Sequence, residues 1–585
     1  MLRTHTCGEL NDKYIGQKVT LCGWVDTRRD HGSVIFIDLR DRWGRTQLVF
    51  DPQTDRKIHA NAEKLRPECV VRIVGVVKKR PQGTENSKLS TGTVEIQAEQ
   101  LEILSTSETP PFEILDDAEI SEELRLKYRY LDLRRPSMLN RLIGRHRITK
   151  IVRDYLDGCG FVEVETPMLT RSTPEGARDF LVPSRLVSGS FYALPQSPQL
   201  FKQILMVSGV DRYFQLARCL RDEDLRADRQ PEHTQIDMEM SFVTEEDIFS
   251  VIEGLLTRIV KGVCAIELKT PFMRMTYDDA MNRFGSDKPD LRFGLELIDA
   301  TSHLRESTVK IFSEVIKKSG VVKGIKVSGC NFSRSELDEL TSFVQMLGAK
   351  GLAWFKVNSN GLEGPVVKFF GSDQQKNLVA LFDAKVGETL FLIADEWLKA
   401  CSILGALRLH LANILGLLKQ TKELKLLWVV DFPLFQWNEE DKRLDAMHHP
   451  FTSPREMDLP LLDREPQRAK ARAYDLVMNG SEIGGGSIRI HQEEVQKKVF
   501  QVLGITKEEA EEKFGFLLRA FRFGAPPHGG IAVGLDRLCA LLFGVDSIRD
   551  VIAFPKTQKG TCPLTDAPGK VYPKQLKELH LQLKT

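Results

Sequence analysis

The stretch RYFQLARCLRDEDLRADRQPEHTQIDMEMSF, residues 212–242, carries the pattern that decides the fold. In its second half polar residues alternate strictly with apolar ones, which is typical of a strand with one polar and one buried face. The polar set is Gln235, Asp237, Glu239 and Ser241, and the apolar set is Ile236, Met238, Met240 and Phe242. In the first half, one face of a partner strand is shared by Gln215, Ala217, Cys219 and Arg221.

The segment that links the two halves, RDEDLRADRQPEH, is too long and too charged for a tight turn. Two antiparallel strands joined in this way would share one polar floor. The residues gathered there would be Arg221, Glu223, Asp237 and Glu239. Alternation alone favours the commoner arrangement, a sheet with one solvent-exposed face.

A second hairpin is predicted in AYDLVMNGSEIGGGSIRIH, residues 473–491, because Asn479-Gly480 is typical of a type I′ turn. Pairing about this turn sets residue 477 opposite 482 and residue 475 opposite 484. Asp475 and Glu482 would then lie diagonally on one face, where two carboxylates and phosphate oxygens can hold Mg²⁺. The glycines at 484–486 would let a ligand approach the backbone. The alternative is a bulged edge strand with an acidic pair at the surface.

A third stretch, HGGIAVGLDRLCALLFG at residues 528–544, indicates a strand that runs into a helix. Arg537 in the first helical turn is unfavourable to the helix dipole unless an anion, such as a phosphate, lies there. The Gly-x-Asp-Arg pattern is weak by itself. QSPQLFK at 196–202 opens a helix with a polar, cationic first turn, for which a routine helix start is the alternative. No Walker-type phosphate loop and no nucleophile motif occurs in the sequence.

Composition limits the class of protein. The chain has 585 residues, 42% of them apolar and 28% charged, which excludes a disordered, collagen-like or disulfide-scaffold protein. With 82 Lys and Arg against 81 Asp and Glu, the net charge of +1 excludes a globally basic nucleic-acid binder but not a local basic patch. Ten scattered cysteines without a CxxC argue against a zinc ribbon and predict free thiols in the cytoplasm. We expect neither a signal peptide nor a membrane span.

Residues 1–105 predict a small all-β barrel of the OB-fold type, with another small barrel as the alternative. The expected strands are Val19–Val25, Ser33–Leu39, Thr46–Phe50, Val70–Val77 and Val94–Ile103. In the second strand Ile35, Ile37 and Leu39 take the core face, which leaves Phe36 outside. A helix is predicted from Asn140 to a C-cap at Gly158, followed by a strand over Phe161–Glu165.

Taken in order, GFVEVETP (160–167), Arg221-Asp222-Glu223 with its long loop and polar strand, and the Gly-x-Asp-Arg helix resemble motifs 1, 2 and 3 of class II aminoacyl-tRNA synthetases. The N-terminal barrel narrows the resemblance to the subgroup that charges aspartate, asparagine and lysine. The chain resembles bacterial-type aspartyl-tRNA synthetases over essentially its whole length. The matching stretches are TPEGARDF (173–180), QSPQLFKQ (196–203), RDEDLRADRQPEHTQID (221–237), AMHHPF (446–451), GGGSIRIH (484–491) and FGAPPHGGIAVGLDR (523–537).

The resemblance implies a multidomain α+β protein. Its expected parts are an OB-fold anticodon-binding domain (1–105), a linker or hinge (106–139), an antiparallel-sheet catalytic domain in two parts (140–285 and 425–555), an inserted α/β domain (286–424) and a C-terminal extension (556–585). It also implies a homodimer, formed largely through the long helix and the segment that ends at Pro167. Two alternatives are a non-catalytic relative that binds tRNA and a sister enzyme that charges asparagine or lysine.

The implied reaction joins aspartate to ATP, releases pyrophosphate, and transfers aspartate from aspartyl-adenylate to the 3′ end of tRNA. The implied catalytic residues are Arg221 at the α-phosphate and Arg537 at the γ-phosphate. The implied ATP site comprises Arg221, Asp222, Glu223, Gln230, His233, Glu482, Gly534, Leu535, Asp536 and Arg537. Mg²⁺ is expected on Asp475 and Glu482. His233 departs from the phenylalanine of many relatives, and it can stack on adenine in the same way.

The implied aspartate site comprises Glu175, Gln199, Lys202, Arg221, Asp237, His448, His449 and Arg489. Lys202 and Arg489 suit the side-chain carboxylate of aspartate, whereas Gln199 and Asp237 suit its ammonium. The resemblance puts Glu175 on a mobile loop that closes over the amino acid. A metal role for the adjacent His448 and His449 is disfavoured, because both cannot reach one site from a strand or helix. Asparagine would be rejected because its neutral amide leaves the two cations without their anion.

On the barrel, the resemblance implies that the anticodon is contacted by Arg29, Phe36 and Gln47. Phe36 would be the ring on which a base stacks. Lys78, Lys79 and Arg80 would add affinity for phosphate. Family members that charge both tRNA(Asp) and tRNA(Asn) tend to carry His and Gly at the positions of His31 and Gly83. We therefore predict an enzyme that charges both tRNAs.

Overall fold

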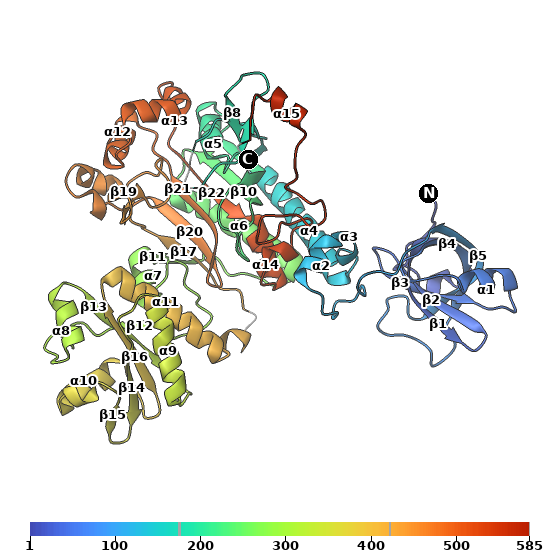
Figure 1. Cartoon of the computed structure of the whole chain (residues 1–585), viewed down its shortest axis with the longest axis horizontal. Helices are drawn as coiled ribbons and strands as arrows, with labels where there is room; N and C mark the ends of the chain where they lie inside the picture. The colour runs from blue at the N-terminus through green and yellow to red at the C-terminus, as the bar shows by residue number, and fades with distance from the viewer. Residues whose placement is uncertain (174–176, 421–422, 584–585) are drawn as a thin grey trace. The chain divides into compact units, whose positions relative to one another are not determined.

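The computed structural model describes residues 1–173, 177–420 and 423–583. The chain divides into two compact units, coloured along the chain in Figure 1. The first contains residues 1–143, 553–557 and 561–568, and the second contains residues 144–552, 558–560 and 569–585. Among the described helices, none is long and apolar enough to cross a membrane.

The first unit begins with a closed five-stranded barrel in the order β1-β2-β3-β5-β4. Its strands are β1 (Lys18–His31), β2 (Val34–Arg40), β3 (Arg45–Phe50), β4 (Val70–Lys79) and β5 (Val94–Ser105), with helix α1 (Arg56–Ala62) after β3. The five predicted strands are confirmed. As expected, Ile35, Ile37 and Leu39 are buried in the barrel core, and Phe36 lies on the outer face of β2, half-buried.

Helices α2 (Glu122–Lys127) and α3 (Arg129–Asp132) follow the barrel, and then comes the long helix α4 (Pro136–Gly158). Helix α4 begins four residues before the predicted start at Asn140. Proline is favoured in a first helical turn because its missing N–H has no partner there in any case. The predicted strand at Phe161–Glu165 is shorter than expected, because only Val162–Glu163 pairs as β6.

The second unit is built on an eight-stranded sheet, β11-β17-β20-β21-β22-β10-β9-β6. The strands besides β6 are β9 (Arg212–Leu220), β10 (Glu232–Ser241), β11 (Met273–Thr276), β17 (Leu426–Val430), β20 (Ala473–Met478), β21 (Ser481–Ile488) and β22 (His528–Gly534). The β9–β10, β20–β21 and β22 stretches were predicted as strands, and all of them pair antiparallel in the centre of the sheet.

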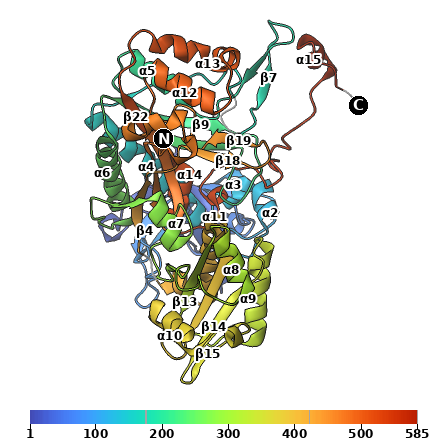
Figure 2. The ribbon, with the colours of Figure 1, turned by 90° about the vertical axis from the view of Figure 1, so that its left-hand side faces the viewer.

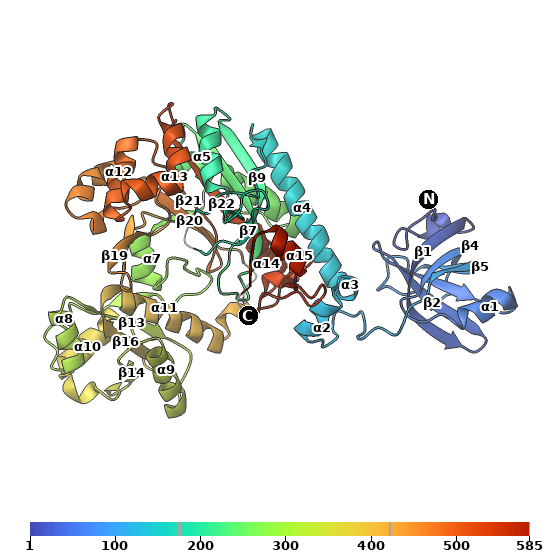
Figure 3. The same cartoon turned by 45° about the horizontal axis from the view of Figure 1, so that its top comes forward.

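One face of this sheet is apolar and is covered by α4, α6 (Glu245–Cys264) and α14 (Leu535–Phe543), as Figure 3 shows for α4 and α14. The alternating residues Ile236, Met238 and Met240 of β10 lie in this core, as predicted. The prediction for Phe242 was wrong: it lies beyond the end of β10, has a φ of +57° and is 75% exposed. The opposite, polar face is therefore left for the site described below.

The hairpin β20–β21 turns at Asn479 and Gly480, whose positive φ values of 52° and 79° fit the predicted turn. Val477 pairs with Glu482, as expected. Asp475, however, pairs with Gly485 and not with residue 484, because a bulge at Ile483 adds one residue to β21. Strand β21 lies between β20 and β22, which excludes the alternative of an edge strand.

An inserted five-stranded sheet, β12-β13-β16-β14-β15, follows α7 (Tyr277–Phe284) and precedes β17. Its strands are β12 (Leu297–Asp299), β13 (Val321–Val327), β14 (Ala353–Asn358), β15 (Gly361–Glu363) and β16 (Thr389–Asp395); its helices are α8 (Lys310–Lys317), α9 (Arg334–Met346), α10 (Ser372–Leu381) and α11 (Trp397–Ile414). Helices cover both faces of this sheet over two separate apolar cores. In Figure 2 this sheet lies at the opposite end of the unit from α5 (Gln199–Val207), α12 (Glu493–Val502) and α13 (Lys507–Phe521).

The remaining described elements are short. They are the hairpins β7 (Leu181–Pro183) with β8 (Phe191–Ala193) and β18 (Phe435–Asn438) with β19 (Arg443–Ala446), the helix α15 (Pro573–Glu578), and the 3-10 helices η1 (Asp12–Tyr14), η2 (Val367–Phe369), η3 (Leu417–Gln420), η4 (Glu456–Asp463), η5 (Pro466–Arg468) and η6 (Ile548–Asp550).

Candidate active site

A cavity of about 530 Å³ opens on the polar face of the eight-stranded sheet. Helix α5, strands β10, β20 and β21, and the segment 447–452 supply most of its lining. The lining includes the predicted residues Gln199, Lys202, Arg221, Glu223, Asp237, His448, His449, Asp475, Glu482 and Arg489. Residues that are up to 290 positions apart in the sequence are thus brought to one cavity, as the sequence analysis expected.

A second cavity of about 250 Å³ adjoins the first. The two share Arg221, Glu223, Gln235, Glu482 and Ala532 in their linings. The second cavity is also lined by Gln230, His233, Gly534, Asp536 and Arg537. Arg221 therefore stands between a cavity that holds Lys202 and Arg489 and a cavity that holds Arg537.

A buried charge cluster forms the floor of the first cavity. Lys202 Nζ lies 3.1 Å from Asp237 Oδ2 and 3.2 Å from Glu239 Oε2. Arg489 donates from Nε to Glu239 Oε1 at 3.0 Å and from Nη1 to Ser487 Oγ at 2.7 Å. Because Lys202 and Glu239 are almost fully buried, each charge needs its partner to offset the cost of leaving water.

The sequence spacing explains how the cluster forms. Gln199 and Lys202 are three residues apart and so share one face of α5, while Asp237 and Glu239 are two apart and share one face of β10. Glu239 was predicted for the polar floor; it is 0% exposed and lies beneath the cavity lining as the link between the two cations.

The cluster shifts the pKa values of its carboxyls in opposite directions. Burial raises the pKa of Asp237 to about 6, although Lys202 opposes the shift. For Glu239, burial is outweighed by Arg489 and Lys202, which hold its pKa below the usual value. Asp237 Oδ1 and Gln199 Nε2 are buried without a hydrogen-bond partner in the described residues. A ligand ammonium would supply the donor that Asp237 Oδ1 lacks.

Both histidines of the AMHHPF stretch reach the first cavity, because they lie in a loop and not in a strand or helix. His448 Nε2 lies 3.3 Å from Asp475 Oδ1, and this carboxylate outweighs burial and raises the pKa of His448. His449 has its pKa lowered to about 3 by burial and by the positive charges of Arg489 and Lys202. His449 is therefore neutral at physiological pH.

Asp475 and Glu482 form the predicted acidic pair. The charge of Asp475, followed by burial, raises the pKa of Glu482, although Arg537, Lys288 and His448 oppose the shift. A Cβ on Gly485 would lie 2.6 Å from Asp475 Oδ1, so any other residue there would displace this carboxylate. This oxygen donor set fits Mg²⁺, which usually takes one or two carboxylates together with phosphate oxygens.

In the part of the chain that the structure describes, no three His, Cys, Asp or Glu side chains form a metal cage by themselves. Gly484 and Gly486 have a different role from Gly485. A Cβ on Gly486 would lie 2.1 Å from Gly530 O, and one on Gly484 would lie 2.8 Å from Ala532 O. These two glycines allow β21 to pair closely with β22.

Arg537 donates from Nη1 to Glu482 O at 2.5 Å and from Nη2 to Asp228 Oδ2 at 3.4 Å. Arg221 Nε, by contrast, is buried without a hydrogen-bond partner among the described residues. His233 lines the same cavity, and burial and Arg221 lower its pKa to about 4, so its ring is neutral. The second cavity is therefore lined by three guanidinium groups, those of Arg221, Arg229 and Arg537, and by a neutral aromatic ring.

Three of the residues predicted for ATP, Asp222, Leu535 and Asp536, are placed away from a direct side-chain role. Asp536 is 4% exposed, and its carboxylate accepts from Arg145 and from Thr234 N, so it holds β10 in place. Leu535 is packed in the apolar core. Asp222 is exposed and lines neither cavity, whereas Gln230 is 3% exposed and lines the second cavity. Glu175 lies outside the described residues.

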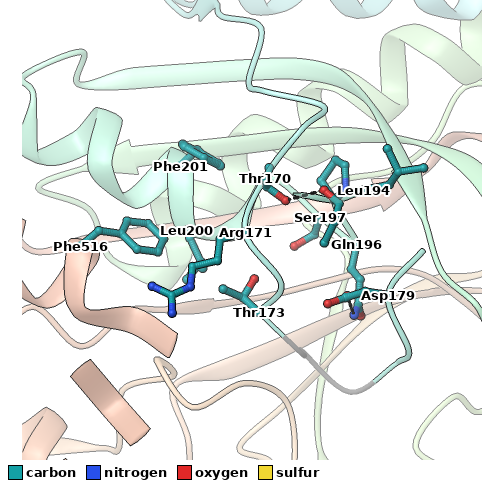
Figure 4. Close-up of a pocket in the computed structure, with 12 residues that line it drawn as sticks. Thr170, Arg171, Thr173, Asp179, Leu194, Gln196, Ser197, Leu200, Phe201 and Phe516 are labelled. Carbon is teal, nitrogen blue, oxygen red and sulfur yellow. Dashed lines mark hydrogen bonds between the residues drawn. The ribbon is translucent and has the colours of Figure 1, made fainter. Parts of the chain in front are cut away.

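A third cavity, of about 280 Å³, shares Gln196 and Ser197 with the first. Figure 4 shows the rings of Phe201 and Phe516 beside Leu200 and Arg171, with Gln196 pointing to Asp179. The two rings have centroids 6.4 Å apart. This cavity is mainly apolar and was not predicted.

On the barrel, Arg29 pairs with Phe36 across β1 and β2, and Asp38 pairs with Gln47 across β2 and β3. Arg29 donates to both oxygens of Asp38 at 2.8 and 2.9 Å and to Gln47 Oε1 at 3.3 Å. These residues form one polar and aromatic patch on the outer face. The centroid of the exposed His31 ring lies 6.5 Å from that of Phe36.

Gly83 is exposed and has a φ of +85°, a conformation that favours glycine. Lys78 and Lys79 are exposed, as a phosphate contact requires. Arg80 is only 6% exposed, and its Nε donates to Val94 O at 3.0 Å, which ties its guanidinium to the start of β5. Its sequence neighbours gave no sign of this burial.

Asp287 and Lys288 are two charged cavity residues that the sequence analysis did not identify. Asp287 lines the first cavity, and Lys288 lines a small cavity beside the second. Both stand at the start of the segment 286–424, which was predicted as the inserted domain. The signal available was the charged run SDKPD at residues 286–290.

The comparisons with known proteins concern the family and the fold of the chain. The family model for tRNA synthetases class II (D, K and N) matches residues 121–558, and that for the OB-fold nucleic acid binding domain matches residues 19–104. The chain is 54% identical to the Aspartate--tRNA(Asp/Asn) ligase of Aquifex aeolicus (strain VF5), covering 99% of this chain and 98% of the relative. It is 56% identical to the ligase of the same description from Persephonella marina (strain DSM 14350 / EX-H1), covering 99% and 97%.

Among solved structures, asparaginyl-tRNA synthetase from Pyrococcus horikoshii complexed with asparaginyl-adenylate matches with a TM-score of 0.60 and 20% identity. The match covers 98% of this chain and 100% of that one. At this identity the likeness concerns the fold.

Proposed function

This chain belongs to the class II tRNA synthetases of the aspartate, lysine and asparagine group, and we propose that it charges both tRNA(Asp) and tRNA(Asn) with aspartate. L-aspartate and ATP react to give aspartyl-adenylate and pyrophosphate, and aspartate then passes to the tRNA 3′ end. The relatives at 54% and 56% identity over almost the whole chain carry the name of this ligase.

The observation that carries the choice of amino acid is the convergence of Lys202 and Arg489 on one cavity. Their charges suit the side-chain carboxylate of aspartate. Asparagine has no charge to offer them, and lysine would add a third cation. At the other end of the substrate, Asp237 suits the ammonium group, since its Oδ1 is a buried acceptor without a partner in the described residues. Gln199 would accept from the same ammonium through its side-chain oxygen. His448, His449 and Glu175 complete the proposed aspartate site.

For activation, an oxygen of the aspartate α-carboxylate attacks the α-phosphorus of ATP, and the bond to the bridging oxygen of pyrophosphate breaks. Arg221 lies between the two cavities and would hold the α-phosphate while charge develops there. Arg537 would hold the γ-phosphate, with the neutral His233 ring against adenine. Glu223, Gln230 and the backbone of Gly534 and Leu535 would line the nucleotide. Mg²⁺, held by Asp475 and Glu482, would neutralise phosphate charge when bound.

For transfer, the tRNA 3′ end must reach the adenylate in the first cavity. The third cavity adjoins it through Gln196 and Ser197, and Phe201 and Phe516 offer aromatic faces to a base. The barrel patch around Arg29, Phe36 and Gln47 would recognise the anticodon. His31 and Gly83 would permit the anticodons of both tRNAs. Arg80 would act by shaping the barrel, because it is buried.

We further propose a cytoplasmic homodimer with the domain boundaries predicted from the sequence. All ten cysteines, each within the described ranges, are free thiols. Strand β6 is an edge of the large sheet, and Val162, Met168 and Leu169 near it are exposed. Exposed apolar residues at a sheet edge are typical of a surface that another subunit covers.

The test is ATP–pyrophosphate exchange with aspartate, asparagine and lysine, followed by charging of tRNA(Asp) and tRNA(Asn) transcripts. We expect exchange with aspartate alone and charging of both tRNAs. Better exchange with asparagine or lysine would overturn the choice of amino acid. A rate for tRNA(Asn) that is about a thousandfold below that for tRNA(Asp), or about 4 kcal/mol in the transition state, would overturn the double specificity.

A further inference from the structure

Lys288 lies in the loop 286–292, between α7 of the catalytic sheet and β12 of the inserted sheet. It lines a cavity of about 210 Å³ together with Asp228, Glu482 and Arg537. We propose that Lys288 is a further phosphate-binding residue, which holds the β- and γ-phosphates of ATP and the departing pyrophosphate. This inference rests on the proposed function, since it assigns a residue to the ATP of that reaction.

The cavity of Lys288 continues the proposed ATP cavity. The two share Asp228, Glu482, Arg537 and Ile548. Arg221 lines the ATP cavity but not the Lys288 cavity, whereas Arg537 lines both. A nucleotide with its α-phosphate at Arg221 and its γ-phosphate at Arg537 would therefore extend its outer phosphates toward Lys288.

The carboxylates that line this cavity outnumber its cations, so a second cation beside Arg537 is compatible with the charges there. Asp228, Glu482 and Asp546 supply three carboxylates, and Arg537 already bonds Asp228 and Glu482 O. Lys288 is exposed, and among the described residues it has no ion pair or hydrogen bond of its side chain. It lines the same cavity as Glu482 and Arg537. Because Lys288 is exposed and lines the cavity, its ammonium is a point charge beside the phosphate path and is available to a ligand.

The loop that carries Lys288 is held from both sides. The carboxylate of Asp290 accepts from Arg292 at 2.6 Å, and Arg292 also reaches Asn479 O at 3.5 Å. A Cβ on Gly480 would lie 2.9 Å from Asp290 Cβ, so the loop packs directly on the β20–β21 turn. The backbone near Lys288 is therefore fixed to the hairpin that carries Asp475 and Glu482.

The inserted domain supplies the second anchor. Arg408 of α11 is 1% exposed and donates to the carbonyl oxygens of Asp290, Phe293 and Gly294 at 2.8–2.9 Å. Its guanidinium carbon also lies 4.0 Å from the centroid of the Phe293 ring. Arg408 is thus a positioning residue, and the insertion has a role in catalysis through the loop that it holds.

The chemistry gives Lys288 a definite task. When the bond between the α-phosphorus and the bridging oxygen breaks, the electron pair leaves with pyrophosphate, and negative charge grows on its oxygens. A cation placed there stabilises the transition state more than the ground state. In the reverse direction, the same cation would bind free pyrophosphate before it attacks the adenylate.

The experiment compares Lys288→Ala and Lys288→Arg with the wild-type full-length enzyme. The KM for pyrophosphate and for ATP in aspartate-dependent exchange should rise about tenfold in Lys288→Ala, and Lys288→Arg should recover all but about threefold. The KM for aspartate and the melting temperature should not change. Lys350→Ala is the matched control, since Lys350 is exposed in the inserted domain and lines none of the cavities described above.

Three results are distinguishable. Unchanged KM values for ATP and pyrophosphate in Lys288→Ala would overturn the proposal. If Lys288→Ala changed only the dependence of exchange on Mg²⁺ concentration, the proposal would also be overturned. Lys288 would then balance the charge of Glu482 and would not bind phosphate. Absence of aspartate-dependent exchange in the wild type would instead overturn the proposed function.

A double-variant cycle tests the role of Arg408. If Arg408 acts through Lys288, then Arg408→Met should raise the KM for pyrophosphate, and the Lys288→Ala/Arg408→Met enzyme should be no worse than Lys288→Ala. Additive effects would show that the two residues act separately. Because Arg408 is buried, its variant is interpreted only if its melting curve is cooperative, and the Lys288 variants test the proposal without it.

Discussion

The catalytic cavity and the barrel surface each contain an arginine that makes a two-pronged contact with one carboxylate. Arg489 donates to both oxygens of Glu239 at 3.0 and 3.3 Å, and Arg29 donates to both oxygens of Asp38 at 2.8 and 2.9 Å. The geometry is nearly the same, but the surroundings differ. The side chains of the first pair are 5% and 0% exposed, and those of the second are 47% and 13% exposed.

Burial changes what such a pair can do. An exposed pair contributes about 0–1 kcal/mol, so Arg29 can leave Asp38 for a phosphate or a base at little cost. A buried pair that loses one partner costs about 3–5 kcal/mol, so Arg489 must keep a compensating charge at all times. The cavity therefore favours one ligand of defined charge, whereas the barrel patch can exchange its contacts among related tRNAs.

The largest expected effect comes from Arg489→Lys, which keeps the charge but removes the planar fork. We expect kcat/KM for aspartate in exchange to fall about a thousandfold, since lysine cannot bond Glu239 and the substrate carboxylate together. The matched change on the barrel, Arg29→Lys, should leave exchange unchanged. Equal losses for the two variants would contradict the comparison.

A second pair of variants separates stability from binding at the same site. Arg489→Met leaves Glu239 buried without its main partner and should lower the free energy of unfolding by about 3–5 kcal/mol. Adding Glu239→Gln should restore much of that stability, as measured by urea unfolding, without restoring aspartate activation. Recovery of activity would mean that Arg489 only supports the fold.

The sequence predicted the parts of the site that follow from local patterns. Alternation in β10 gave the polar floor, and Asn479-Gly480 gave the turn of the β20–β21 hairpin. The sequence pattern could not predict the bulge at Ile483. The glycine-rich stretch has too few side chains to show where one residue has been added to the strand. The prediction for Phe242 failed because alternation does not mark where pairing stops.

Contacts between distant segments were also beyond the sequence. Lys288 and Arg408 are 120 positions apart, and only the fold brings Arg408 into contact with the loop that carries Lys288. The burial of Arg80 depends on a carbonyl of the next strand, Val94 O, and its basic neighbours gave the opposite impression. Glu239 was predicted to face the floor, but its contacts with both cations required helix α5 and the residue that follows β21, Arg489, to reach β10.

On the barrel side of the comparison, Phe36→Ala should act on tRNA alone. Stacking of one base on an aromatic ring contributes about 1–3 kcal/mol, so kcat/KM for tRNA should fall about thirtyfold while exchange stays unchanged. Trp43→Ala is the matched control, because Trp43 is an exposed aromatic residue of the same barrel, 53% exposed and outside the patch. A similar loss in both variants would show that the barrel has no defined stacking site.

A pH series tests the buried side of the comparison. Burial raises the pKa of Asp237 to about 6, so its protonated fraction rises as the pH falls through that value. Because the substrate ammonium needs the carboxylate form, the KM for aspartate should rise about tenfold between pH 8 and pH 5. Asp237→Asn should have a higher KM that no longer varies with pH. A profile that is flat in the wild type would remove Asp237 from the ammonium site.

The smallest expected effect concerns His31, at the exposed rim of the barrel patch. His31→Leu keeps apolar bulk beside Phe36 but removes two ring nitrogens that can bond a base. Since the two anticodons differ at one position, kcat/KM for tRNA(Asn) should fall about fivefold, or about 1 kcal/mol, and that for tRNA(Asp) less than twofold. Equal changes for the two tRNAs would assign His31 to general affinity and not to selectivity. Unlike Arg489, His31 is exposed and has no buried charge to leave behind, so its variant should fold normally and any change should appear in the ratio of the two tRNAs alone.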